Sequence, residues 1–262
     1  MTAELIRTDS DAALAVDVAS RMPRDITALP AALSGGRRLR VSVGVHTGVV
    51  RGHLVGTSQV GLFLCGPDVS TLVALQTRAD PGQVLMSAAT AAQVAPTWNA
   101  GPVGDMFAVR PRRRASSAAT RWPVAVDEPR SVALPAACTA LLGPTVRELL
   151  AEGTTHGDFR TASFGFLKVW GLDGIAAREG GAGAHAALAH VVELVTRVAA
   201  EEAVEWLDVS PGVDSTNFLL SAGAPRSIEH DEDQMLIVLR RLVDECEVPV
   251  SAGAQRGRVF SG

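Results

Sequence analysis

A segment near the start of the chain recurs close to its end, and this repeat restricts the fold more than any other feature. Residues 250–259 align with residues 41–50 at a constant offset of 209 (250 − 41), and five of the ten aligned pairs are identical. An amphipathic helical pattern precedes the aligned segment in both places. We therefore expect two copies of one domain type, each of them incomplete.

The sequence divides into two structured blocks, residues 1–109 and 145–262, joined by a linker rich in Arg, Pro and Ser at residues 110–144. The arginines of this linker have two interpretations, a contact with phosphate or nucleic acid and a solvated connection. No aromatic residues alternate with them, which favours the solvated linker. These arginines are Arg110, Arg112, Arg113, Arg114 and Arg121.

Apolar spacing predicts the elements of both blocks. In the first block we expect strands at residues 39–45, 49–55, 60–65 and 83–87. Helices are expected at residues 11–21, from residue 68 onward and at residues 88–94, with Asp68 and Ser87 as N-caps. In the second block we expect strands at residues 159–170, 204–209 and 217–222 and helices at residues 184–204 and 231–245.

Composition excludes several classes of protein. The chain is 47% hydrophobic and 20% charged, which is typical of a globular protein and not of a disordered one. Its net charge of −4 predicts no affinity for nucleic acid or for an anionic membrane surface. No apolar run is long enough for a membrane-spanning helix. Cys65, Cys138 and Cys246 stand far apart, which predicts neither disulfides nor a CxxC metal site and favours a cytoplasmic location.

The ordered motifs resemble a known family. Residues 40–48 (RVSVGVHTG), residues 54–57 (LVGT), Gly66 at the start of a helix and residues 79–87 (ADPGQVLMS) are similar to the C-terminal half of a class III adenylate/guanylate cyclase homology domain. Residues 159–262 are similar to the N-terminal half of the same domain. The resemblance implies an α/β (α+β) fold with a ferredoxin-like βαββαβ sheet in two incomplete copies, as in tandem, degenerate bacterial cyclase proteins.

The resemblance also implies where catalytic residues should lie. In the family, two aspartates hold divalent metal ions, and an asparagine and an arginine come from the partner half. The aspartate positions fall on Lys168 and Thr216, and the asparagine and arginine positions fall on Ser70 and Ala74. A polar residue that selects the base would fall near Phe63. We therefore expect no metal site, no cofactor and no catalytic residues.

Other residues with reactive side chains have structural interpretations. Asp173 and Asp214 lie near the aspartate positions but out of register. His46 is expected to be a turn or sheet-edge residue, His185 and His190 to be surface residues, and Cys65 to be packed in the core. Lys168 has two interpretations, a phosphate contact and a side chain with its stem packed and its amine in water; the second is favoured.

We therefore expect a catalytically degenerate nucleotide-cyclase-like module for signalling or dimerisation. Its partner would be a cyclase-type domain in cis or in trans, including a second copy in a homodimer, and we expect no nucleotide binding. One alternative is a divergent adenylate/guanylate cyclase half-site that is active only with a partner chain. Another is a non-functional gene fragment, suggested by the end of the sequence within a motif at Gly262.

Overall fold

The computed structural model describes residues 2–4, 11–29, 38–94, 98, 100–110, 139–153 and 157–261. Linker arginines 112, 113, 114 and 121 lie outside these residues. The chain folds as two compact units. Unit 1 consists of residues 1–4, 50–67 and 133–262, and unit 2 of residues 5–49 and 68–132. Among the described helices, none is both long and apolar enough to cross a membrane.

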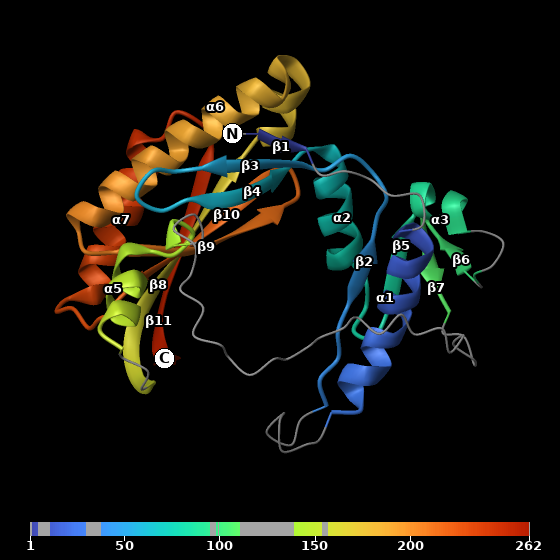
Figure 1. The fold of residues 1–262 in the computed structure, drawn as a ribbon, viewed down its shortest axis with the longest axis horizontal. Coiled ribbons are helices and arrows are strands. Elements are labelled where there is room, and N and C mark those ends of the chain that lie inside the picture. Colours follow the sequence, from blue (N-terminus) through green and yellow to red (C-terminus); the bar gives the residue numbers. More distant parts are fainter. Residues whose placement is uncertain are drawn as a thin grey trace. The chain divides into compact units, whose positions relative to one another are not determined.

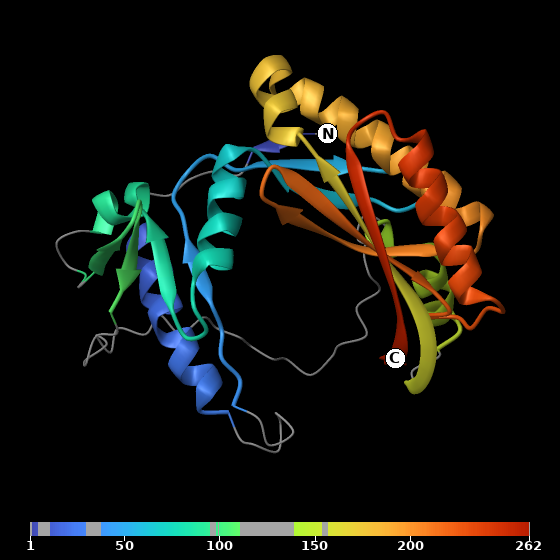
Figure 2. The same ribbon diagram turned by 180° about the vertical axis from the view of Figure 1, so that it is seen from behind.

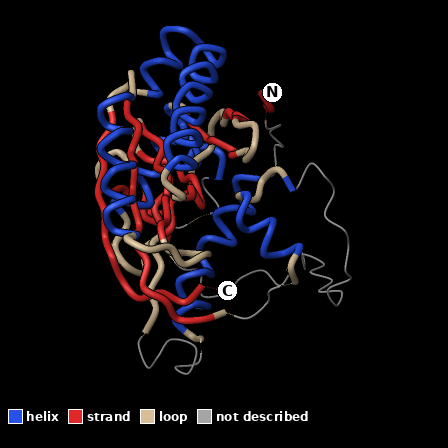
Figure 3. The backbone as a smooth tube through the Cα atoms, turned by 90° about the vertical axis from the view of Figure 1, so that its left-hand side faces the viewer, coloured by secondary structure: helices blue, strands red, loops and turns tan. Residues whose placement is uncertain are grey.

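The second half of the chain builds a four-stranded antiparallel sheet in unit 1. The strands β8 (Asp158–Trp170), β9 (Glu205–Gly212), β10 (Ser215–Ala222) and β11 (Val250–Ser261) lie in the order β11-β8-β10-β9. Helices α6 (Leu172–Glu201) and α7 (Asp231–Glu245) connect them and lie over the same face of the sheet (Figures 1 and 3). This order and connectivity are those of a ferredoxin-like βαββαβ unit, as the sequence predicts.

The core of unit 1 lies between this sheet and its two helices. Apolar residues recur on one face of α6 at helical spacing, and a matching stripe on α7 faces the same strands. The buried residues of this core include Leu188, Val191, Val195, Val198, Phe218, Leu220, Met235, Val238 and Leu242. The α6 helix begins at Leu172, earlier than the predicted residue 184, and contains one non-helical residue, Gly180, with φ of +72°. A positive φ is tolerated there because glycine has no Cβ.

A hairpin from the first half of the chain belongs to the same unit. Strands β3 (Arg51–Val55) and β4 (Gly61–Cys65) pair with each other, and β1 (Thr2–Glu4) pairs with β3. Val55, Phe63 and Cys65 enter the core that α6 and the second half of the chain form. The turn is held as well, because the Gln59 side-chain amide donates to Trp206 O at 3.0 Å. The two sequence blocks therefore share one core.

Unit 2 contains the rest of the first half. Its sheet has the order β2-β5-β7-β6, from β2 (Val43–Val45), β5 (Val84–Ser87), β6 (Ala100–Val103) and β7 (Met106–Val109). The helices are α1 (Asp11–Thr27), α2 (Pro67–Arg78) and α3 (Ala88–Val94), and Figure 2 shows α2 beside β2. Val16 of α1 packs with Val45, Val84 and Met86 of the sheet.

Several element predictions need correction. Residues 39–42 are not strand, because β2 pairs with β5 only over Val43–Val45. Asp68 is not an N-cap, since α2 already begins at Pro67. The β6–β7 hairpin and helix α5 (Pro144–Ala151) were not predicted from the sequence patterns. The prediction for Ser87 is confirmed, because its Oγ accepts the Thr90 N–H at 3.2 Å at the start of α3.

Candidate functional site

Lys168, the first position where the resemblance places a metal-binding aspartate, lies near the end of β8. Strand pairing puts it directly opposite Asn217 on β10. Its ammonium nitrogen is 3.8 Å from the centroid of the Trp170 ring, whose indole N–H donates to Ser251 Oγ at 3.0 Å. The face of the ring attracts the cation. An ammonium repels a divalent cation, so this position does not fit the metal that the family uses.

Thr216, the second such position, points away from Lys168. Its neighbour Asn217 is the residue opposite Lys168, whereas Thr216 is opposite Val169. Successive side chains of a strand lie on opposite faces, and Thr216 is 1% exposed on the core face. Its Oγ donates to Ser210 O at 3.3 Å. The two positions therefore do not converge on one site.

Asp173 and Asp214 lie close together, and their carboxylates bind backbone amides. Asp214 Oδ1 accepts the Asp173 N–H at 3.0 Å, which is a bond to the first turn of α6. Asp173 Oδ1 accepts the Gly66 N–H at 3.1 Å and so ties the end of the β3–β4 hairpin to the start of α6. In the described part of the chain, no three His, Cys, Asp or Glu side chains form a group able to hold a metal ion.

The positions for the partner-half residues lie on α2. Ser70 and Ala74 are four residues apart, so they share one face of the helix, and both are partly exposed. A serine hydroxyl is shorter than the asparagine amide of the family, and alanine has no group that could stabilise charge. Phe63, near the base-selecting position, is 1% exposed, and its ring centroid is 5.5 Å from that of Phe218. It is a core residue of unit 1.

His46 lies at the end of β2 in an arrangement that looks like a Ser-His-Asp triad. Its Nδ1 is 2.8 Å from Ser87 Oγ and its Nε2 is 3.0 Å from Asp68 Oδ1. Asp68 Oδ2 also accepts the Val49 N–H at 2.7 Å. Ser87 is only 7% exposed, and its Oγ accepts the Thr90 N–H and so caps α3. The cluster fixes the turn that follows β2.

A pair of neighbouring histidines in unit 1, one buried and one half-buried, was not found from the sequence. His53 on β3 is 0% exposed, and its ring centroid is 5.7 Å from that of His185 on α6. Burial lowers the pKa of His53 most, and the nearby His185 lowers it further. The prediction that His185 is a surface residue is correct only in part, because the residue is half-buried and its Nδ1 is buried. His190 is exposed, as predicted. Cys65 is packed in the core, also as predicted. Burial raises the pKa of the Cys65 thiol to about 11.

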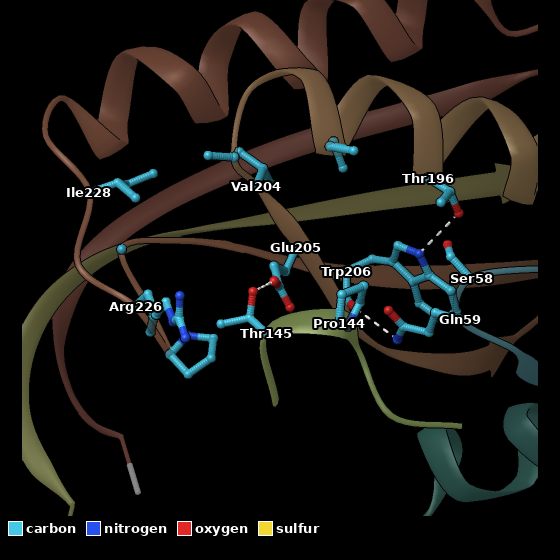
Figure 4. A pocket seen from close by; sticks show the side chains of 16 residues that line it. Ser58, Gln59, Pro144, Thr145, Thr196, Val204, Glu205, Trp206, Arg226 and Ile228 are labelled. Carbon is cyan, nitrogen blue, oxygen red and sulfur yellow. Dashed lines mark hydrogen bonds between the residues drawn. The ribbon is translucent and has the colours of Figure 1, made fainter. Parts of the chain in front are cut away.

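A pocket of about 320 Å³ lies in unit 1 between the end of α6, the start of β9 and the start of α5. Its walls are mainly apolar, and Figure 4 shows Glu205 beside Thr145 within it. Thr145 Oγ1 donates to Glu205 Oε1, while Oε2 is buried without a hydrogen-bond partner among the described residues. On the other side of the pocket, the Trp206 indole N–H donates to Thr196 Oγ1 at 3.2 Å.

Burial raises the pKa of the Glu205 carboxyl, because desolvation disfavours the charged form. The hydrogen bond from the Thr145 backbone acts in the opposite direction. Arg226 at the pocket is paired with Glu152 at 3.0 Å and Glu148 at 3.3 Å. Even so, the positive charge of Arg226 lowers the pKa of Glu205, against the larger effect of burial.

An apolar groove of about 550 Å³ runs along the edge of β2 in unit 2. We call it the edge groove. One side of it is α1, with Leu14 52% and Val18 50% exposed, and the other side is Leu72 of α2, 37% exposed. Gly44 of β2 allows α2 to approach, since a Cβ there would lie 2.9 Å from Leu72 O. Large apolar side chains are thus exposed beside a sheet edge.

The βαββαβ order of unit 1, together with the strand–turn motif that recurs in unit 2, defines a cyclase-type α+β protein. Residues 6–113 match the family model described as "Adenylate and Guanylate cyclase catalytic domain". This match confirms the resemblance of the chain to the class III adenylate/guanylate cyclase family. A search of curated protein sequences finds no match.

One solved structure supports the fold, and others are similar over parts of the chain. A class III adenylyl cyclase-like ATP-binding protein from Pseudomonas aeruginosa is similar with a TM-score of 0.52 and 12% identity, over 97% of this chain and 60% of that chain. The catalytic core of a rhodopsin-guanylyl cyclase has a TM-score of 0.36 and 16% identity, over 42% of this chain and 62% of that chain. A bacterial light-regulated adenylyl cyclase has a TM-score of 0.40 and 11% identity, over 48% of this chain and 40% of that chain. The chain thus spans less than two thirds of each of these proteins.

Proposed function

We propose that this protein is a catalytically degenerate nucleotide-cyclase-like module that acts in signalling or dimerisation. Its partner is a cyclase-type domain, in cis or in trans, and the module itself forms no cyclic nucleotide. The observation that carries this proposal is the strand register of β8 and β10. Lys168, an ammonium at the first expected aspartate position, lies opposite Asn217, whereas Thr216, at the second, lies opposite Val169 on the core face.

The electrostatics of this position support the proposal. A bound divalent metal ion stabilises the charge that develops on the triphosphate by several kcal/mol. Lys168 places a positive charge at one ligand position, and Thr216 lies on the core face of the sheet and cannot supply a ligand to the other. Ser70 and Ala74 likewise lack the groups that the partner half contributes in the family. Losses at separate positions that act as a unit leave little activity.

The test is a turnover assay on the purified chain. ATP or GTP is incubated with the protein and Mg²⁺ or Mn²⁺, and cyclic nucleotide is measured by mass spectrometry. We expect no product above a control without protein. Metal-dependent product that disappears with chelator would contradict the proposal and would instead support a divergent cyclase.

A further inference from the structure

The two repeated strands, β2 and β11, have different neighbours in the described residues. β2 is the edge of its sheet and pairs only with β5, in parallel. β11 is the edge of the other sheet and pairs only with β8, antiparallel. Because the two strands repeat the same sequence, the neighbour of one strand indicates which neighbour the other strand would have in a complete domain. The backbone hydrogen bonds of β2 and β11 show at which edge of β2 that neighbour would lie.

In β2 and the two residues before it, the odd-numbered residues face β5 and the two residues that precede β5. The Val43 N–H donates to Gln83 O, and the Gly82 N–H donates to Val41 O, both at 3.0 Å. Backbone groups of successive residues in a strand point to opposite sides. The N–H and C=O of Ser42 and Gly44 therefore point to the edge that has no neighbouring strand among the described residues.

On β11, the residues that face β8 belong to the corresponding set. The Trp170 N–H of β8 donates to Pro249 O at 2.9 Å, so Ser251 and Gly253 also face β8 by alternation. At the offset of 209, Ser251 and Gly253 correspond to Ser42 and Gly44. The open edge of β2 is therefore the edge to which its copy binds an antiparallel strand.

We propose that the open edge of β2, together with the edge groove, is a docking site for an antiparallel β-strand of the β8 type. This strand is the first strand of a cyclase-type half domain, so the inference rests on the proposed function. Main-chain hydrogen bonds to Ser42 and Gly44 hold it, as in other cases of strand addition. Its side chains alternate between the apolar surface of α1 and Leu72 of α2.

The occupant is a strand other than the chain's own β8. Within the described residues β8 is already paired on both edges, with β10 over residues 163–170 and with β11 over residues 158–169. A second copy of this chain has the same paired β8. The strand therefore comes from another cyclase-type half domain whose first strand is open on one edge, and the apolar surfaces at Leu14 and Val18 match an apolar strand and not a charged one.

The probe is a fluorescein-labelled peptide with the sequence of residues 158–170, added to the full-length chain. The free peptide represents a first strand whose edges are unpaired, unlike β8 within the folded chain. Binding is measured by fluorescence anisotropy, and amide hydrogen exchange is followed by NMR. We expect saturable binding, with slower exchange at Gly44. Val18→Glu and Leu72→Glu each place a charge in the edge groove and should weaken binding by about tenfold or more. Leu236→Glu, on α7 and 58% exposed, is the matched control and should change binding less than about twofold.

Three outcomes would overturn the inference. The first is no binding up to about 1 mM peptide by a wild-type chain whose thermal transition shows that it is folded. The second is unchanged affinity in both Val18→Glu and Leu72→Glu; two variants on different helices are used because one of them may fail to fold. The third is slower exchange at Ala252 of β11 instead of Gly44. Peptide binding is independent of turnover, so cyclic nucleotide formation by a chain that binds the peptide would contradict the proposed function alone.

Discussion

Lys168 on β8 lies opposite Asn217 on β10, and the side chain of Thr216 lies on the other face of the same sheet. The two positions at which the resemblance places metal-binding aspartates therefore lie on different faces of the sheet. Restoring both carboxylates would place one on the open face, next to Trp170, and one in the core.

We expect Lys168→Asp combined with Thr216→Asp to yield no cyclase activity and a less stable protein. The Thr216 side chain is 1% exposed, and a buried carboxylate without a partner costs about 3 kcal/mol or more. Lys168→Asp with Asn217→Asp is the matched comparison, because it places both carboxylates on one face. Cyclic nucleotide assays and thermal unfolding measure the two effects. Activity in the Lys168/Thr216 variant would show that the sheet rearranges.

Sequence patterns were sufficient where local signals agree. Helix α7 has the predicted bounds, because acidic residues begin it and Met235, Val238 and Leu242 recur at helical spacing. Sequence patterns were insufficient where the pairing of distant strands decides the structure. Residues 39–42 alternate like a strand, but the strand pairing with β5 extends only over Val43–Val45.

The candidate site shows the same limit. The resemblance locates Lys168 and Thr216 by counting from glycines, but only the register of β8 and β10 shows that they lie on different faces. The burial of His53 depends on α6, more than a hundred residues further along the chain. In the sequence, His53 shares one face of the expected strand with Arg51 and Val55. This spacing does not tell whether that face is covered by another element.

The buried His53 should make unit 1 sensitive to acid. Its pKa in the folded protein lies below the ordinary value of 6.5, mainly through burial, with smaller contributions from His185 and Arg51. The unfolded chain therefore binds a proton more strongly, and stability falls as the pH drops below about 6.5 toward the folded-state pKa. His53→Leu should remove this part of the acid sensitivity, measured by urea unfolding between about pH 7 and pH 5. His190→Gln, at an exposed site, is the control; equal acid sensitivity in wild type and His53→Leu would contradict the prediction.

Asp231 at the start of α7 should also lose its stabilising contribution as the pH falls, but in a lower pH range than His53. Its side chain is 7% exposed; it accepts bonds from Arg256 Nη2 at 2.9 Å and from Ser163 Oγ at 2.8 Å. Mainly the Arg256 bond holds its pKa below the ordinary 3.8, so the stabilisation is present above about pH 3.8 and is lost as the pH falls toward the folded-state pKa. Arg256→Ala should lower the free energy of unfolding by about 1–3 kcal/mol at pH 7. The loss should be smaller at pH 3, and Gln255→Ala on the same strand should change little at either pH.

Glu205 should show a stability that decreases as the pH rises. Its pKa in the folded protein lies above the ordinary 4.5 because of burial, so the folded state binds the proton more strongly. The stabilisation is complete below about pH 4.5 and is lost as the pH rises through the folded-state pKa. Glu205→Gln keeps an acceptor for Thr145 and should remove this dependence, whereas Glu148→Gln, which is exposed, should not. Urea unfolding at a series of pH values measures the pH dependence of stability. An unchanged pH profile in Glu205→Gln would refute its assignment to Glu205.

Phe63 should be a major contact between the hairpin and the second half of the chain. It is 1% exposed, and its ring centroid is 5.5 Å from that of Phe218 on β10, although the two residues lie in different sequence blocks. Phe63→Ala leaves a cavity in the shared core and should cost about 3–5 kcal/mol of unfolding free energy. Leu62→Ala, on the same strand but 50% exposed, should cost much less. Thermal and urea unfolding of the full chain give both values, and similar losses in the two variants would mean that the hairpin does not stabilise unit 1.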